Sequence, residues 1–181
     1  MRKVLFLLGQ LSDEDVEWIG RVGERRRLKP GDALIREGHQ VDWLYVILEG
    51  RASVSVDGIG EVASLGVGEV VGEMSFIDTL PPSATVTAAM PGRVLAVDKR
   101  TLARRLAEDP LFASRFYRSL AILLSDRLRA ATRFKATPPG TLRLDGDEAL
   151  DRELDGNVLD TLSQAGARFD RLIKMLNAAA G

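Results

Sequence analysis

Residues 72–86 of this 181-residue chain read GEMSFIDTLPPSATV and lie between two runs of β-prone residues. A glycine followed by an acid opens the stretch, a short apolar turn follows, and small residues lead back into a strand. Free backbone N–H groups of a short turn can hold an anionic phosphate, and a carboxylate can accept a hydrogen bond from a sugar hydroxyl. This stretch is therefore the first candidate for a ligand site.

On both sides of this stretch, the chain between Arg25 and Asp98 alternates short β-prone runs with glycines. Residues 53–56, Ser-Val-Ser-Val, alternate as a half-buried strand does, and residues 57–58, Asp-Gly, are typical of a hairpin turn. Short strands at such regular spacing indicate a sandwich or barrel. The predicted strands are residues 27–29, 34–36, 43–48, 52–56, 61–65, 69–71, 85–89 and 94–97.

Helical signals flank these strands. Ser12 is the expected N-cap of a first helix that ends near Gly20, and Asp98 is the expected N-cap of a short helix that ends at Ala107. Proline at position 110 suits the first turn of a long helix, because its missing N–H is not needed there. The apolar residues of this long helix are spaced by three and four and need a packing partner. They are Phe112, Phe116, Leu120, Leu123, Leu124, Leu128 and Ala131.

Residues 137–140, Thr-Pro-Pro-Gly, are expected to end the long helix. We therefore divide the chain into a domain at 1–135 that includes the long helix 110–135, a linker at 136–144, and a helical tail at 145–181. The tail carries heptad-spaced apolar residues, which predict a coiled-coil-like seam over 158–179 that could bind a protein partner. They are Val158, Leu162, Ala165, Phe169, Leu172, Leu176 and Ala179.

With residues 28–32 (LKPGD), 35–38 (IREG) and 44–50 (LYVILEG), the opening stretch resembles the cyclic nucleotide-binding domain family, including the effector domains of catabolite-activator-like proteins. The resemblance extends from about Leu5 to Phe134. It implies a mixed α+β fold: an eight-stranded β-roll, similar to a jelly roll, with an N-terminal helix, a long C-terminal dimerisation helix and here a further helical tail.

The resemblance also implies a phosphate-binding cassette. Glu73 would accept a hydrogen bond from the ribose 2′-hydroxyl of cAMP or cGMP, and Ser83 with the Ala84 N–H would contact the cyclic phosphate. Thr132 is the candidate for a contact over the base. The long helix would form a homodimer through its apolar stripe. The full set of expected ligand-binding residues is Gly72, Glu73, Met74, Ser75, Pro82, Ser83, Ala84 and Thr132.

One position departs from the family pattern. An arginine normally stands directly before the small residue at 83 and pairs with the phosphate, but here the residue is Pro82. A charge-assisted hydrogen bond is worth about 1.5 to 3 kcal/mol, so its loss lowers affinity by about tenfold to a few hundredfold unless another cation replaces it. Arg36 or a basic residue of the long helix could do so. Alternatively, the cassette survives as a fold element that binds no cyclic nucleotide.

Composition excludes several kinds of chemistry. The chain has no cysteine and a single histidine, His39, so disulfides, thiolate metal sites and most histidine-based catalytic sites fall away. Residues 58–63 formally fit a dinucleotide fingerprint, but a strand rather than a helix is expected to follow. We expect a non-enzymatic regulatory module with no metal and no resident cofactor.

The charge distribution and the targeting signals limit where the protein can be located and what it can bind. The net charge is −1, but ten basic against three acidic residues give +7 between Lys99 and Lys135, and one basic against six acidic residues give −5 between Asp145 and Asp155. The acidic run could fold back on the basic helix as an electrostatic latch. The apolar run at 4–8 is too short for a signal peptide and no run is long enough for a membrane span, so we expect a soluble, cytoplasmic protein.

Two other functions remain open at this stage. One is a transcription regulator of the same family with a reduced DNA-binding tail, in which residues 162–176 would form a helix-turn-helix with its turn at Gly166. The acidic run would repel DNA phosphates, so we consider DNA binding unfavourable. The other is a structural protein-interaction domain with no small ligand.

Overall fold

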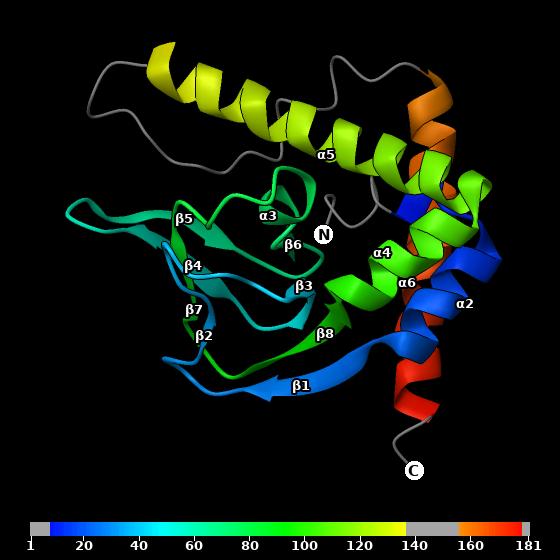
Figure 1. Ribbon diagram of the computed structural model, residues 1–181, viewed down its shortest axis with the longest axis horizontal. Helices are drawn as coiled ribbons and strands as arrows, with labels where there is room; N and C mark the ends of the chain where they lie inside the picture. The colour runs from blue at the N-terminus through cyan, green and yellow to red at the C-terminus, as the bar shows by residue number, and fades with distance from the viewer. Residues whose placement is uncertain (1–7, 137–155, 179–181) are drawn as a thin grey trace.

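The computed structural model describes residues 8–136 and 156–178. Eight antiparallel strands form two four-stranded sheets (Figure 1). The first sheet has the order β1-β8-β3-β6, and the second has the order β2-β7-β4-β5. The strands are β1 (Glu24–Leu28), β2 (Ala33–Ile35), β3 (Trp43–Glu49), β4 (Ala52–Val56), β5 (Gly60–Leu65), β6 (Val70–Val71), β7 (Thr85–Ala88) and β8 (Gly92–Asp98).

The predicted mixed α+β roll with eight strands is confirmed. The largest difference is in the first strand, which begins at Glu24 rather than at position 27. The hydrophobic pattern does not reveal the start of this strand, because three of its five residues are arginines. β1 pairs only with β8, and an edge strand that is paired on one side tolerates long charged side chains.

β3 and β8, the central strands of the first sheet, are buried on both faces, which explains their long apolar runs. Side chains alternate across a strand. Leu44, Val46 and Leu48 therefore pack against the helices, whereas Tyr45 and Ile47 point into the roll between the two sheets. The roll interior is completed by residues from both sheets, namely Ile35, Ala52, Leu65, Val71, Val86, Val94 and Ala96.

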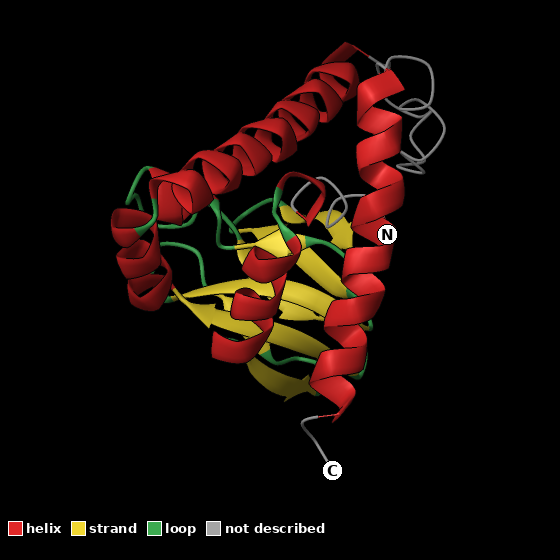
Figure 2. Ribbon diagram, turned by 90° about the vertical axis from the view of Figure 1, so that its right-hand side faces the viewer, coloured by secondary structure: helices red, strands yellow, loops and turns green. Residues whose placement is uncertain are grey.

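Helices cover the outer face of the first sheet (Figures 1 and 2). Ser12 caps the first of them in a reciprocal capping box with Asp15, and Asp98 accepts a hydrogen bond from the Thr101 N–H at 2.7 Å, as expected. The helices are α2 (Asp13–Val22), α3 (Met74–Ile77), α4 (Lys99–Glu108), α5 (Pro110–Ala136) and α6 (Gly156–Ala178).

The C-terminal helix α6 packs against α2 and the first sheet of its own chain (Figure 2). A Cβ at Gly20 would lie 2.9 Å from Leu172 Cδ1, so glycine lets the two helices approach closely. Arg168 and Arg171 donate to the Asp13 carboxylate at 2.8 and 2.7 Å. α2 therefore continues past Gly20 to Val22, because this glycine serves helix packing rather than helix termination.

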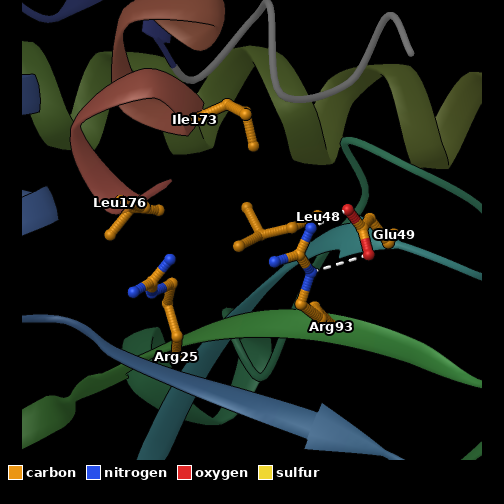
Figure 3. Close-up of a pocket in the computed structure, with 6 residues that line it drawn as sticks. All are labelled: Arg25, Leu48, Glu49, Arg93, Ile173 and Leu176. Carbon is orange, nitrogen blue, oxygen red and sulfur yellow. Dashed lines mark hydrogen bonds and ion pairs between the residues drawn. The ribbon is translucent and has the colours of Figure 1, made fainter. Parts of the chain in front are cut away.

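The far end of α6 meets the roll at a tight junction (Figure 3). Ile173 and Leu176 lie opposite Leu48 and Arg25, beside the ion pair between Arg93 and Glu49. The cavity left between them is about 10 Å³, which is about the space of one water molecule. The helix is thus packed against the sheet with almost no void.

The predicted seam of α6 is used within the chain. Its heptad residues Ala165, Phe169, Leu172 and Leu176 are all buried in the protomer's own core. α6 also runs through Gly166 without a break, so the helix-turn-helix that was the alternative at 162–176 is not formed. The seam side chains Val158, Leu162 and Ala179, the predicted linker beyond Ala136 and the acidic run 145–155 lie outside what the structure describes.

None of the helices within the described ranges combines the length and the apolar character that crossing a membrane requires.

Candidate functional site

The cassette, residues 72–84, begins where β6 leaves the first sheet. Gly72 has φ +90°, and a Cβ there would lie 2.6 Å from the Trp43 carbonyl oxygen. Only glycine fits this close approach of two backbones. The turn directs the next side chain, Glu73, into the protein, where only 2% of it is exposed.

The buried Glu73 carboxylate is bound by a cation from the long helix. Arg127 of α5 donates one hydrogen bond to Glu73 Oε1 and another to the Val70 carbonyl oxygen. A buried carboxylate is costly unless it is paired, and Arg127 supplies the partner. The helix α5 is thereby attached to Glu73, the residue for which the family resemblance implies a hydrogen bond from the ribose.

The sequence does not single out Arg127; it indicates only that some basic residue of the long helix could reach the pocket. Its position carries a signal in retrospect. It lies seven residues after Leu120 and four after Leu123, two fully buried residues of α5, and residues at this spacing share one face of a helix. A lone arginine on a mostly apolar helix face indicates a buried acid opposite it.

The short helix α3 follows Glu73 and lies beneath α5 (Figure 1). The Phe76 ring packs edge-on against Phe116 of α5, with ring centroids 6.0 Å apart. On the other side, Lys99 Nζ donates to Ser75 Oγ at 2.8 Å. Met74 is half-exposed and makes the outer surface of this turn. The cassette helix is therefore in contact with both α4 and α5.

The second half of the cassette returns to β7 along the turn that precedes β3. The Gly38 N–H donates to the Pro82 carbonyl at 2.9 Å, and the Glu37 N–H donates to Thr85 Oγ1 at 3.1 Å. Ser83 is exposed and Ala84 is half-buried, so both are within reach of a ligand. Pro82 is thus fixed by its carbonyl, but it has neither a charge nor an N–H to offer a phosphate.

Arg36, the other cation considered as a replacement for the missing arginine, lies beside a different hollow of the surface. It lines a cavity of about 220 Å³ whose walls are residues 33–36 and 39–43 with Tyr45, and no cassette residue is among them. The exposed His39 belongs to the same wall. Within the described part of the chain, no three His, Asp or Glu side chains come close enough together to hold a metal ion.

The predicted dimer stripe of α5 divides into two parts. Phe112, Phe116 and Leu120 are 0% exposed and belong to the protomer's own core, so they face the chain itself rather than a second copy. Leu124 is half-buried, and Leu128 is 69% exposed. The side chains of Ala131 and Thr132 lie outside the part that the structure describes.

Comparisons with known proteins agree with this geometry. Residues 25–109 match the family model of the cyclic nucleotide-binding domain. The cAMP-dependent protein kinase regulatory subunit of Eremothecium gossypii is 34% identical over 104 residues, which is 58% of this chain and 23% of that protein. The chain thus spans about a quarter of the length of such curated relatives.

Two solved structures extend the match in space. A cyclic nucleotide-binding domain from Methylobacillus flagellatus superposes with a TM-score of 0.65 and 26% identity, covering 77% of this chain and 85% of that one. The N-terminal domain of a transcriptional regulator from Streptomyces coelicolor gives a TM-score of 0.60 and 30% identity, covering 68% and 94%. With its β-roll, its buried cassette glutamate and these matches, this chain belongs to the cyclic nucleotide-binding domain family.

Proposed function

We propose that this chain is a non-enzymatic regulatory module that binds a cyclic nucleotide in the cassette and transmits its occupancy to the long helix α5. The observation that carries the proposal is the Glu73–Arg127 pair, in which the cassette acid is buried and held by α5. A ligand hydroxyl that binds Glu73 competes with Arg127 or shares the carboxylate with it. Either way, ligand binding changes the contact between the cassette and α5.

The proposed ligand contacts are those of the family pattern. Glu73 accepts from the ribose 2′-hydroxyl beside Gly72, Met74 and Ser75, while Ser83 and the Ala84 N–H bind the phosphate next to Pro82. Thr132 contacts the base. Because Pro82 offers no cation, we expect cAMP or cGMP to bind weakly compared with relatives that carry arginine there.

The ligand signal has a second route into α5 through Phe76, which packs on Phe116. A ligand shifts an equilibrium only by its differential affinity for the two states, so α5 must contact the occupied and the empty cassette differently. Phe76 and Arg127 both change their surroundings when α3 moves, and together they supply that difference.

We propose further that the module is a homodimer through α5. Tyr117, Ala121, Leu124 and Leu128 are spaced by four, three and four residues, which is the spacing of a coiled-coil seam. Tyr117 and Leu128 are 50% and 69% exposed. Leu124, Leu128 and Ala131 of the predicted stripe thus remain in the proposed seam, whereas Phe112, Phe116 and Leu120 do not.

Calorimetric titration with cAMP and with cGMP tests the ligand proposal. We expect saturable binding to the wild-type chain, and Glu73→Gln should weaken it by about tenfold or more, because a charged acceptor is replaced by a neutral one. Asp57→Asn, on the exposed β4–β5 turn, is the matched control and should leave affinity unchanged. No heat of binding at millimolar ligand would favour an interaction domain that has lost its ligand.

The unbroken α6 offers no recognition helix of its own in the described residues, so we do not favour DNA binding. A gel shift with sequence-specific, salt-sensitive retardation would reverse this conclusion about DNA.

We also propose a cytoplasmic location, where a cyclic nucleotide signal is available to the cassette. A pull-down with the full chain tests whether a protein partner binds.

A further inference from the structure

Lys99 is placed where a lysine is unfavourable. It is the first residue of α4, and the positive end of a helix dipole repels a cation there. Its side chain is half-buried, and burial lowers the pKa of Lys99. Its neighbour Arg100, by contrast, is exposed to solvent. A cation at an unfavourable helix N-terminus is typical of a residue with a functional role.

The surroundings of Lys99 belong to the cassette. Its Nζ donates to Ser75 Oγ at 2.8 Å, and its backbone N–H donates to the Asp42 carbonyl at 2.8 Å, which fixes where the side chain starts. Three carboxylates, those of Glu73, Asp42 and Asp78, act against burial and favour its charged form. Burial therefore disfavours the charged form of Lys99, and these three acids favour it.

Two cations thus hold α3 from two elements. Arg127 of α5 binds Glu73, directly before the helix, and Lys99 of α4 binds Ser75, its second residue. The charges that face Lys99 are Glu73, Asp78 and Asp42, and Glu73 is also paired with Arg127. Among these, only the cations can attract an anionic ligand to a cassette that lacks arginine at position 82.

We propose that Lys99 is a positioning residue for ligand binding: it fixes the cassette helix through Ser75, and its charge supplies part of the attraction for phosphate that an arginine at position 82 would give. This inference rests on the proposed function. Lys99 acts through Ser75 and through its electric field, and it need not contact the ligand.

Titrations with cAMP at several pH values test the role of the charge. Lys99→Met removes both the cation and its charge-assisted hydrogen bond to Ser75, and together these losses should weaken binding by about tenfold. Ser75→Ala keeps the charge and should cost about two- to threefold. Arg100→Met, the exposed neighbour, is the matched control and should change affinity less than about twofold.

The pH profile separates charge from shape. As pH rises through the pKa of Lys99, which lies below 10.5, the ammonium loses its proton and wild-type affinity should fall. Lys99→Arg keeps a cation and should flatten the profile. A wild-type profile that matches that of Lys99→Arg would overturn the charge role.

Amide hydrogen exchange on the ligand-free chain tests the positioning half independently of any ligand. Lys99→Met should speed exchange at residues 74–78 severalfold, whereas Arg100→Met should not. If wild type fails to bind cAMP, the proposed function fails, and this exchange result alone decides whether Lys99 holds the cassette. Faster exchange together with unchanged cAMP affinity would make Lys99 merely structural and would overturn the proposal.

Discussion

The two halves of α5 share one apolar pattern, but the first half packs in the core and the second half lies over the cassette. In the first half, Phe112, Phe116, Leu120 and Leu123 are all 0% exposed in the core with α2, α4 and α6. In the second half, α5 extends over the cassette, where Arg127 binds Glu73 and Leu128 is largely exposed. The helix is therefore buried in the core along its first half, whereas its second half lies over the cassette and is exposed at Leu128.

A core substitution in the first half should have the largest effect. Phe116→Ala removes a fully buried ring that packs on Phe76 and Phe112, and should lower the free energy of unfolding by about 3 to 5 kcal/mol. Leu128→Ala in the second half should cost the isolated chain less than about 1 kcal/mol. Urea unfolding followed by circular dichroism measures both. Equal losses would remove the distinction between the halves.

The ion pair that anchors the first half should give the next largest effect. Arg115 donates to the 2% exposed Asp15 at 2.7 and 3.0 Å. Asp15→Asn should cost about 2 to 3 kcal/mol at neutral pH, less than a wholly buried pair because Arg115 is partly exposed. Asp13→Asn, whose carboxylate is 49% exposed toward Arg168 and Arg171, is the control and should cost under about 1 kcal/mol.

The Asp15 effect should depend on pH in a definite direction. Burial raises the pKa of Asp15, but hydrogen bonds from Arg115 and Ser12 outweigh it, so the pKa lies below its usual 3.8. A lowered folded pKa stabilises the protein above the unfolded value, and this contribution is lost as pH falls below about 4. The stability gap between wild type and Asp15→Asn should therefore shrink on acidification. A constant gap would contradict the pairing.

The second half should control self-association. Leu128→Glu places a charge on the proposed seam and should weaken a homodimer by at least tenfold in sedimentation velocity, because two such charges meet across a twofold interface. Leu111→Glu, which is exposed on the first half and lies about a third of a turn away from the seam, should leave association unchanged. A wild-type chain that sediments as a monomer at high concentration would contradict the seam.

The smallest effect is expected in the cassette turn. Thr79 has φ +58°, which is unfavourable for a β-branched residue. Thr79→Gly relieves this strain but raises the conformational entropy of the unfolded chain. The free energy of unfolding should therefore rise by less than about 1 kcal/mol. Thermal unfolding measures the change, and a clear loss would mean that the Thr79 hydroxyl, which donates to the Asp78 carbonyl, matters more than the strain.

The sequence was sufficient for most of the fold, because glycine punctuation and β-runs are local signals. It identified all eight strands, and it placed the cap residues Ser12 and Asp98. Long-range pairings were less accessible. The sequence around Arg127 does not indicate that its partner is Glu73, and the sequence around Lys99 does not indicate Ser75. These residues meet only when α4 and α5 pack on the cassette.

The amphipathic spacing of a helix also does not identify the surface that its apolar face packs against. The α6 residues Ala165, Phe169 and Leu172 have the spacing of a coiled coil, yet they complete the chain's own core on α2. In α5, the same ambiguity merged core residues with seam residues. Spacing tells which face is apolar, whereas the topology decides what covers it.

We propose that the second half of α5 responds to occupancy of the cassette through Arg127. The chain has no cysteine, so a fluorophore on Ser125→Cys, an exposed site of α5, labels this half uniquely. Titration with cAMP should change its emission with the midpoint found by calorimetry, Arg127→Met should abolish the change at saturating cAMP, and a label on Ser114→Cys should stay silent. Unchanged emission from Ser125→Cys while cAMP saturates the site would contradict the account.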